Sequence, residues 1–307
     1  MQVTAAQVKE LRELTGAGMS NCKNALVEAE GNVTRAVEIL REKGLSAAAK
    51  KAGRIAAEGL VKSSISADRK VGALVEVNSE TDFVAKNDEF IDFVQNVADL
   101  SLSSVAEQLS DFLAEKWPGS DTTVQDELTS KIAKIGENLT IRRFERYIAS
   151  ENGHIVDYIH GGGRVGVMVE LITPNFNESV YEAGRNVAMQ IAAMSPQFVS
   201  SDEMSDEYKT KEREILTQAA LNENADAEKP KPEQVIVKMV EGRLAKQFKE
   251  VCLLDQEYVR DGDFNVAGYL KSVGDVTVKR FVRFEKGEGI EKKEEDFAAE
   301  VAAAMNV

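Results

Sequence analysis

The amino-acid sequence predicts an α+β protein in which helical segments surround a duplicated core of strands and a helix. Two observations indicate this class. The spacing of apolar residues changes from three or four to two near Ala57, which marks a change from helices to strands. The strand-rich pattern that follows recurs 94 residues later, and such a repeat indicates two similar structural units. With 307 residues, of which 43% are hydrophobic, the chain is long enough to bury a core in each unit.

Residues 1–54 are expected to form a separate helical domain. Apolar residues such as Leu11 and Leu40 recur at helical spacing in three short stretches. The run Thr15–Met19 separates the first two stretches, and Gly31-Asn32 separates the last two, because such residues interrupt helices. This segment carries nine basic and six acidic residues, so its net charge is 9 − 6 = +3, whereas the whole chain carries −14. A basic helical domain therefore precedes an acidic remainder of the chain.

Residues 55–150 are expected to form the first unit of the core. Alternating polarity predicts two strands joined by a polar turn, followed by a helix, at Leu60–Ile65, Val71–Val77 and Glu89–Leu100. A polar helical stretch then extends to about Gly136, and Leu139–Tyr147 is expected to be a further strand.

Residues 151–284 are expected to form the second unit. The two strands recur without a gap at His154–Ile159 and Arg164–Leu171. Identical pairs include Gly59 and Gly153, Gly72 and Gly166, and Glu76 and Glu170. The sequence therefore predicts an internal ββα duplication that builds a core of two subdomains.

Two long, charged segments interrupt the second unit. They are Asp202–Asn224 and Glu233–Val251, and only a short break with two prolines separates them. Two helices so connected must run antiparallel, so residues 202–251 are expected to form a protruding helical hairpin. A last strand is expected at Val276–Phe284, and residues 285–307 are expected to form a small C-terminal module with a short helix at Glu295–Met305.

The connection between strand and helix is about four residues longer in the first unit than in the second, because the helices align best at an offset of 90. The extra length falls at Ser79–Asn87, a segment that contains Phe83. Packing of the shared fold does not require this addition, which makes it the first candidate for function. Phe83 could serve as an exposed apolar anchor for a partner, beside the carboxylate of Asp82. Alternatively, it could turn inward as the first core residue of the following helix, and spacing alone favours this second interpretation slightly.

The sequence lacks the signatures of a catalytic site. It has no phosphate-binding loop, no nucleophile elbow and no Cys/His pair with metal-ligand spacing. Gly161–Gly163 precedes a strand and not a helix, so it is expected to form a hairpin turn. Cys22 and Cys252 lie far apart in the sequence and are expected to be buried, reduced thiols. No bond-making chemistry, metal site or cofactor is therefore expected.

Net charge and hydropathy exclude two further classes of partner. A net charge of −14 repels a phosphate backbone, so nucleic acid is not expected as a direct partner. The longest stretch without a charged residue, Asn186–Ser201, is too short to cross a bilayer. The first ten residues include Lys9 and Glu10 with no apolar segment behind them, so the protein is expected in the cytoplasm.

Five motifs together resemble one protein family, in that family's order and over nearly the whole chain. They are Thr15–Met19 with Cys22-Lys23, Thr81–Asn87, Lys134–Asn138, Ile159–Gly166 and Phe284–Lys292. The family is bacterial translation elongation factor Ts. The resemblance implies an N-terminal module similar to ubiquitin-associated (UBA) domains, a duplicated core, a coiled-coil hairpin that forms homodimers in some members, and a C-terminal module.

The resemblance also implies an activity and the residues that perform it. Members are guanine-nucleotide exchange factors for elongation factor Tu, and they bind this GTPase in its GDP-bound and nucleotide-free forms. The second motif intrudes between helices of the GTPase near its magnesium site, which implies that the partner-binding wedge here is Thr81, Asp82, Phe83, Val84, Ala85, Lys86 and Asn87. The other partner contacts that it implies are Gly18, Met19, Lys23, Ile135, His160 and Val259.

Two other functions compete with this interpretation. In the first, the protein is an adaptor whose helical domain of residues 1–54 recruits partners while the core only displays it; the Ser79–Asn87 segment would then be dispensable. In the second, it is a nucleotide-binding enzyme, which would require the protein itself to bind GDP. The missing phosphate-binding loop argues against the second.

Overall fold

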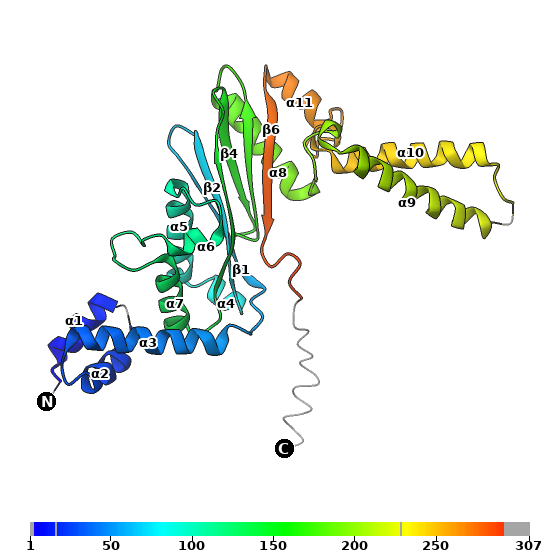
Figure 1. Cartoon of the computed structure of the whole chain (residues 1–307). Coiled ribbons are helices and arrows are strands. Elements are labelled where there is room, and N and C mark those ends of the chain that lie inside the picture. Colours follow the sequence, from blue (N-terminus) through cyan, green and yellow to red (C-terminus); the bar gives the residue numbers. More distant parts are fainter. Residues whose placement is uncertain (1–2, 16, 228, 292–307) are drawn as a thin grey trace.

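A computed structural model of the chain describes residues 3–15, 17–227 and 229–291. It has the α+β architecture that the sequence predicts, with two three-stranded antiparallel sheets and helices on their outer faces. Figure 1 shows a helical bundle at one side of this core and a long helical hairpin that projects from the other side.

Three helices form the N-terminal bundle, namely α1 (Ala5–Thr15), α2 (Met19–Glu28) and α3 (Val33–Lys51). Leu11, Cys22 and Leu26 are fully buried between them. The Asn32 side chain caps α3 by accepting a hydrogen bond from the amide of Arg35 at 3.0 Å. The apolar pattern predicts α3 only as far as Leu40, but the helix continues to Lys51. Its second half leaves the bundle and packs on the core.

The contact between α3 and the core is made with α7 (Val124–Ile135). Arg41 Nη2 on α3 lies 2.7 Å from Asp126 Oδ1 on α7. A Cβ added at Gly44 would lie 3.7 Å from a methyl group of Thr129, so the two helices are in van der Waals contact along small side chains. One continuous helix thus connects the bundle to the core.

The first sheet has the order β1-β2-β3, with β1 at Glu58–Ile65, β2 at Val71–Ser79 and β3 at Thr140–Ile148. Its outer face is covered by α5 (Asp88–Ser103), whose Phe90, Phe93 and Val97 are buried against the strands. The other helices of this unit are α4 (Asp82–Ala85), α6 (Leu109–Ala114) and α7.

The second sheet has the order β4-β5-β6, with β4 at Gly153–His160, β5 at Val165–Ile172 and β6 at Thr277–Glu285. Helices α8 (Glu178–Met194) and α11 (Val266–Val273) cover its outer face. The strands that correspond to β1 and β2 therefore lie where the duplication predicts them, and the glycines at 161–163 form the β4–β5 turn with positive φ angles.

The duplication extends further than the sequence analysis recognised. The strands β3 and β6 also correspond, because Thr140-Ile-Arg-Arg-Phe aligns with Thr277-Val-Lys-Arg-Phe at an offset of 277 − 140 = 137. Both strands carry the same irregularity opposite the second strand of their sheet, next to Glu76 in one unit and Glu170 in the other. The repeated unit is ββαβ, and the hairpin inserted before β6 conceals the last strand by changing its offset.

Each unit places one fully buried glutamate, Glu76 or Glu170, in its middle strand. Arg143 Nε donates to Glu76 Oε2 at 2.6 Å, and Arg280 Nε donates to Glu170 Oε2 at 2.6 Å. A carboxylate buried without such partners would cost several kcal/mol. The two arginines come from corresponding positions of β3 and β6, so the same pair stabilises both units.

A further hydrogen-bond donor to each glutamate follows the third strand of the opposite unit. The amide of Gly287, after β6, donates to Glu76 Oε1 at 2.8 Å. The amide of Ser150, after β3, donates to Glu170 Oε1 at 2.8 Å. The two units therefore exchange donors, in addition to the donors that each carboxylate has within its own unit, among them Arg142 for Glu76 and Lys279 for Glu170.

The two sheets also pack face to face through the inner side chains Val61, Leu74, Ile155 and Met168. The close approach requires small residues at the equivalent positions Gly72 and Gly166. A Cβ at Gly72 would lie 2.6 Å from Ile155 Cγ2, and one at Gly166 would lie 2.9 Å from Leu74 Cδ1, which are overlaps.

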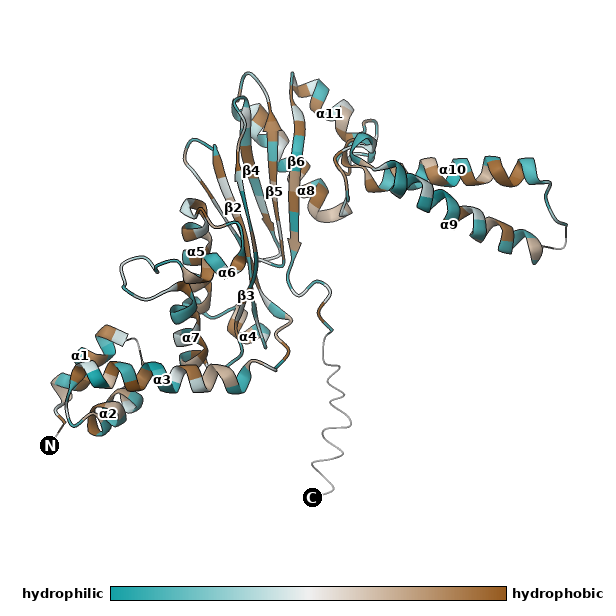
Figure 2. Cartoon of the chain, in the orientation of Figure 1, coloured by the Kyte–Doolittle hydropathy of each residue, from teal (hydrophilic) through white to brown (hydrophobic). Residues whose placement is uncertain are grey.

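The hairpin consists of α9 (Asp206–Ala225) and α10 (Glu233–Val251), preceded by η1 (Ser201–Glu203) and followed by η2 (Leu253–Asp255). Its two helices pack through Ala220, Ile236 and Val240. Figure 2 shows that α9 is mostly hydrophilic whereas α10 carries hydrophobic residues along its length, which fits a hairpin closed by one thin apolar seam.

Three remaining expectations have different outcomes. Cys22 and Cys252 are buried and form no disulfide, as predicted. The helix expected at Glu295–Met305 lies outside the described residues, as does most of the expected C-terminal module 285–307. Within the described ranges, no helix is long and apolar enough to span a bilayer.

Replacing Gly166 with alanine should destabilise the fold by about 1–3 kcal/mol, because the added methyl group would overlap Val61, a β-branched side chain that cannot turn away. Urea denaturation measures the effect. Gly242→Ala is the matched control, since nothing lies within 4 Å of a Cβ at Gly242 on α10, and there alanine should stabilise the helix slightly. Equal denaturation midpoints for Gly166→Ala and the unmodified protein would contradict the close packing of the sheets.

Glu170 should make stability depend on pH. Burial raises its pKa, but the Ser150 amide and the Arg280 guanidinium lower it more, so the pKa lies below its ordinary value of 4.5. A lowered folded-state pKa stabilises the fold above pH 4.5 and loses this contribution as pH falls through the folded-state value. The free energy of unfolding should therefore fall more steeply below that pH in the unmodified protein than in Glu170→Gln. Parallel curves for the two proteins would show that the carboxylate does not contribute.

Candidate protein-binding site

The added segment of the first unit begins where β2 ends at Ser79, and it is more ordered than an extended loop. Residues 82–85 form the short helix α4, and the Thr81 hydroxyl caps it by accepting from the amide of Val84 at 3.4 Å. The next helix, α5, begins directly afterwards, with the Asn87 side chain accepting from the amide of Glu89 at 2.9 Å. Residues 79–87 are called the exchange loop below, after the role that the family resemblance implies for this segment.

Phe83 projects from the exchange loop into solvent, and 80% of its surface is exposed. The interpretation in which it turns inward as a core residue is therefore wrong. Ala85 is buried instead, and Val84 packs against the core of the first unit. Since those two side chains occupy the inner face of so short a helix, the ring of Phe83 is left on the outer face.

Two residues anchor the start of the exchange loop from the motif at Lys134–Asn138. The amide and hydroxyl of Thr81 donate to the Glu137 carboxylate at 3.0 and 2.6 Å. The backbone amide of Asn138 donates to Glu80 Oε1 at 2.5 Å. Gly136 makes this geometry possible by ending α7 with a φ of +90°.

The sequence analysis did not identify Glu137 or Asn138 as site residues, although it quoted the motif that contains them. The signal was the motif itself, whose acidic and amide side chains are not needed to end a helix. Asn138 Nδ2 also donates to the carbonyl of Arg54 at 2.8 Å. The motif therefore joins the exchange loop to the segment that connects α3 with β1.

Asp82 carries an ionised carboxylate on the exposed side of α4. Its pKa is lowered chiefly by a hydrogen bond from the Lys86 ammonium, with a smaller contribution from the charge of Lys286. Lys86 Nζ lies 2.6 Å from Asp82 Oδ2, and both side chains remain accessible. An exposed pair of this kind is weak, so a partner can replace either ion at little cost.

The structure brings two further predicted contacts near the exchange loop. Ile135 is the last residue of α7, next to the anchoring motif. His160 ends β4, and its Nδ1 lies 2.9 Å from the Tyr158 hydroxyl. The adjacent turn contacts the first sheet, because the amide of Val61 donates to the carbonyl of Gly163 at 2.8 Å.

The remaining predicted contacts lie elsewhere. Gly18, Met19 and Lys23 are exposed at the start of α2 in the bundle. Val259 is exposed in the segment between η2 and α11, where its amide donates to the buried Gln190 side chain at 2.9 Å. Figure 1 shows α2, α4 and α11 well separated along the molecule. These residues could contact one large partner but cannot line one pocket.

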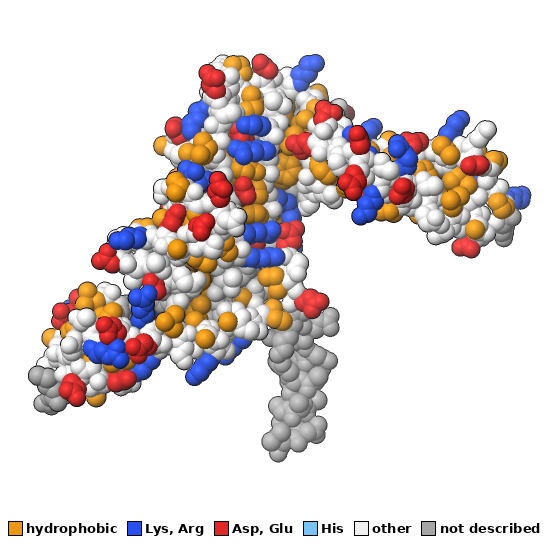
Figure 3. Space-filling view, in the orientation of Figure 1, with side chains coloured by type: hydrophobic (Ala, Val, Ile, Leu, Met, Phe, Trp, Pro, Cys, Tyr) orange, Lys and Arg blue, Asp and Glu red, His pale blue; other side chains and the backbone are white. Residues whose placement is uncertain are grey.

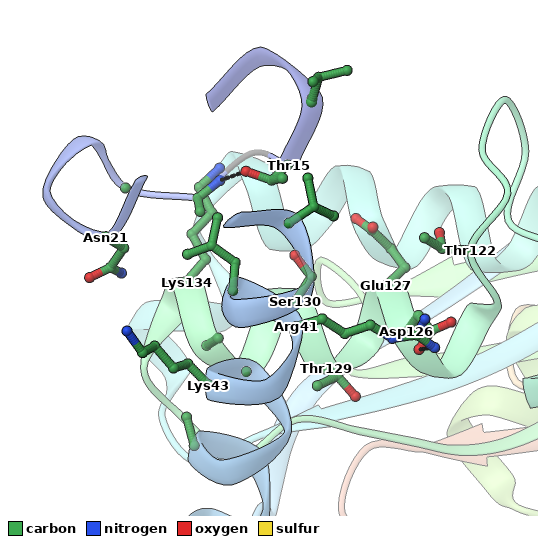
Figure 4. A pocket seen from close by; sticks show the side chains of 18 of the residues that line it. Thr15, Asn21, Arg41, Lys43, Thr122, Asp126, Glu127, Thr129, Ser130 and Lys134 are labelled. Carbon is green, nitrogen blue, oxygen red and sulfur yellow. Dashed lines mark hydrogen bonds and ion pairs between the residues drawn. The ribbon is translucent and has the colours of Figure 1, made fainter. Parts of the chain in front are cut away.

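A groove of about 460 Å³ lies between the bundle and the core, as Figure 4 shows. Helices α3 and α7 form its floor, where Arg41 reaches Asp126, and Thr15 and Asn21 lie on the side of the bundle. Gly18 also lines it. The bundle contacts predicted from the sequence are therefore next to a concave surface.

Charged groups of both signs surround these contacts. Figure 3 shows acidic and basic side chains interspersed over this face of the molecule. In the described part of the chain, no group of three or more His, Cys, Asp or Glu side chains is placed to hold a metal ion. Aromatic side chains are enriched at protein–protein interfaces, so the exposed ring of Phe83 marks a candidate protein-binding surface.

Comparison with known proteins gives the family. The sequence model described as "Elongation factor TS" matches residues 80–288, more than half of the chain. Elongation factor Ts of Clostridium perfringens (strain 13 / Type A) is 54% identical over 305 residues, which cover 98% of each chain. The elongation factors Ts of Clostridioides difficile (strain 630) and Clostridium tetani (strain Massachusetts / E88) are 52% and 51% identical, and 99% of each chain is covered in both comparisons. The chain belongs to the elongation factor Ts family.

Removing the anchor of the exchange loop should increase its mobility without unfolding the core. In Glu137→Ala, Thr81 loses both hydrogen bonds to the carboxylate, so the amides of residues 82–87 should exchange hydrogen for deuterium faster. Mass spectrometry of peptides from this segment and from β5 measures the change. Glu10→Ala, on the exposed face of α1, is the control. Unchanged exchange in residues 82–87 of Glu137→Ala would show that the anchor does not order the exchange loop.

Proposed function

We propose that the protein is a guanine-nucleotide exchange factor for elongation factor Tu, and that it acts in the cytoplasm during translation elongation without bond-making chemistry of its own. Its family supports the assignment, and the exposed ring of Phe83 on the anchored helix α4 is the observation that carries the mechanism. The nucleotide and magnesium sites belong to the GTPase, which explains why the sequence has no phosphate-binding loop.

In this mechanism the exchange loop acts as a wedge. Phe83 enters an apolar space between helices of the GTPase, and burial of an aromatic ring of about 150–250 Å² supplies binding free energy. Asp82 lies next to it on the same short helix and brings a negative charge toward the region that binds magnesium and phosphate. A wedge that moves the ligands of magnesium weakens GDP binding.

Thermodynamic linkage sets the limits of this activity. If the factor weakens GDP binding, GDP weakens binding of the factor by an equal ratio. The factor therefore stabilises the nucleotide-free GTPase and accelerates exchange in both directions. The cellular excess of GTP over GDP then determines which nucleotide enters.

The other predicted contacts would hold the GTPase while the wedge acts. We propose that Lys23, Gly18 and Met19 bind it through the bundle, that Ile135 and His160 bind it beside the exchange loop, and that Val259 binds it at the far end of the second unit. All of them except the half-buried Ile135 are exposed, and they lie on separate elements, which supports an extended interface. Such an interface retains affinity when one contact is lost.

The division of the chain and its oligomeric state belong to the same proposal. The proposed domains are a UBA-like domain at 1–54, core subdomains at 55–150 and 151–284, and a C-terminal module at 285–307.

Exposed apolar residues on the hairpin, among them Ile215 and Val237, support a homodimer through its two helices. Sedimentation of the unmodified protein and of Val237→Glu tests the dimer, because the charged variant should be monomeric.

Phe83→Ala should slow GDP release from elongation factor Tu by a factor of about 30, the cost of losing a contact worth about 2 kcal/mol. Release of a fluorescent GDP into excess unlabelled nucleotide measures it. The thermal midpoint should not change, because the ring is exposed. Asp82→Ala should also slow release.

Val105→Ala is the matched control, since Val105 is 87% exposed and lies outside the exchange loop. Wild-type rates in both loop variants would reject the wedge. If the wild-type protein itself failed to accelerate release, the adaptor interpretation, in which the bundle recruits partners, would replace the proposed function.

A further inference from the structure

The ion pair between Lys286 and Glu58 has no counterpart in the second unit. At the offsets of 137 and 94 that relate the units, the corresponding residues are Ala149 and Asn152, which cannot form an ion pair. The repeated fold therefore does not need this contact. The exchange loop is another addition that the second unit lacks, and the two additions lie at the same end of the first sheet.

Lys286 belongs to a short segment, residues 285–290, that is called the C-terminal strap below. It leaves the second sheet at the end of β6 and crosses to the first unit. The amide of Lys286 still donates to the carbonyl of Arg164 in the second unit at 2.9 Å. One residue later, the amide of Gly287 donates to Glu76 in the first unit at 2.8 Å.

Gly287 shows how closely the C-terminal strap approaches the first unit. Its φ is +67°, and an added Cβ would overlap the carbonyl of Ala57, which lies just before β1. The corresponding residue after β3 is Ser150. The C-terminal strap therefore approaches the start of β1 more closely than a residue with a side chain would allow. Arg142 holds the next residue by donating to the carbonyl of Glu288.

Glu58 connects the C-terminal strap to the exchange loop. It is paired across the sheet with Ser79, the last residue of β2. The Asn78 side chain donates to the carbonyl of Glu58 at 3.0 Å, and the Ser79 hydroxyl donates to the carbonyl of Thr81 at 3.0 Å. The position of Glu58 is therefore coupled, through these contacts, to Ser79 and Thr81, the residues that precede α4.

The ion pair between Lys286 and Glu58 is partly buried. The side chains of Lys286 and Glu58 are 22% and 23% exposed, whereas those of Lys86 and Asp82 on α4 are 74% and 49% exposed. Partial burial reduces screening by water and salt. In Figure 3 basic and acidic side chains meet at the lower end of β6, where the C-terminal strap begins.

On the basis of the proposed exchange function, we propose that Lys286 and Glu58 form a latch that positions the exchange loop for insertion into the GTPase. Both are positioning residues that act through the exchange loop, because Glu58 is paired across the sheet with Ser79, the residue from which the loop begins. The latch also assigns a role to the Phe284–Lys292 motif, which no other part of the mechanism uses.

The first experiment measures GDP release at several concentrations of Lys286→Met, which keeps most of the side chain and removes its charge. We expect the maximal release rate to fall about three- to tenfold. The concentration that gives half of that rate should change less, because the bundle and Val259 still bind the partner. Lys286→Arg keeps the charge and should retain most of the activity. Arg243→Met removes an ion pair with Glu223 in the hairpin and is the matched control.

The second experiment is a double-mutant cycle with Phe83→Ala. If the latch acts through the exchange loop, Lys286→Met should have a smaller effect once the ring of Phe83 is absent. An equal reduction in both backgrounds would mean a general structural role and would overturn the proposal. So would a wild-type maximal rate in Lys286→Met.

The third experiment exchanges the two charges in Glu58→Lys/Lys286→Glu. A latch should regain part of the activity that either single variant loses. If the swapped protein folds but is no more active than the single variants, the ion pair is not the device that positions the loop.

Hydrogen exchange separates failure of the latch from failure of the proposed function. Lys286→Met should speed deuterium uptake in residues 82–87 whether or not any GTPase is present. Faster uptake with no acceleration of GDP release by the wild-type protein would reject the exchange function and keep the latch. Unchanged uptake would reject the latch alone.

Discussion

The buried carboxylates of Glu76 and Glu170 are the constraint on which the rest of the structure depends. Each must be satisfied in a place that water does not reach, and each accepts hydrogen bonds both from its own unit and from the other. Separation of the units would remove the Gly287 donor from Glu76 and the Ser150 donors from Glu170, and a buried carboxylate that loses donors is destabilised. The two sheets therefore act as one rigid base, and their close contact at Gly72 and Gly166 follows from this arrangement.

The exchange loop is held in one conformation by its contacts with the core. Its backbone is fixed by Glu137 at the end of α7 and by Glu80, which is held by Asn138 and Arg54. A side chain held in place before binding loses less conformational entropy when it meets a partner. Because the backbone of the loop is fixed, the ring of Phe83 stays exposed on a helix of only four residues and does not turn inward.

The sequence was informative where one local pattern determines the structure. Alternating polarity predicts the first two strands of each unit, and the break with two prolines predicts the hairpin. The correspondence of β3 with β6 was missed because the inserted hairpin changes the offset from 94 to 137. The anchor Glu137 was missed because it lies 56 residues from Thr81, and no local pattern reports such a distance. The orientation of Phe83 was undecided because only the packing of Val84 and Ala85 determines it.

Helix α3 has a geometric consequence for the whole molecule. It begins in the bundle and ends beside the core, so the bundle is oriented by the rotation of one helix. Each residue of an α-helix turns the chain by about 100° and advances it by about 1.5 Å. A single insertion between Leu40 and Gly44 would therefore swing the start of α2 to another side of the molecule while leaving the apolar contacts within the bundle intact. The number of residues in α3 therefore determines the direction in which the surface of the N-terminal bundle faces.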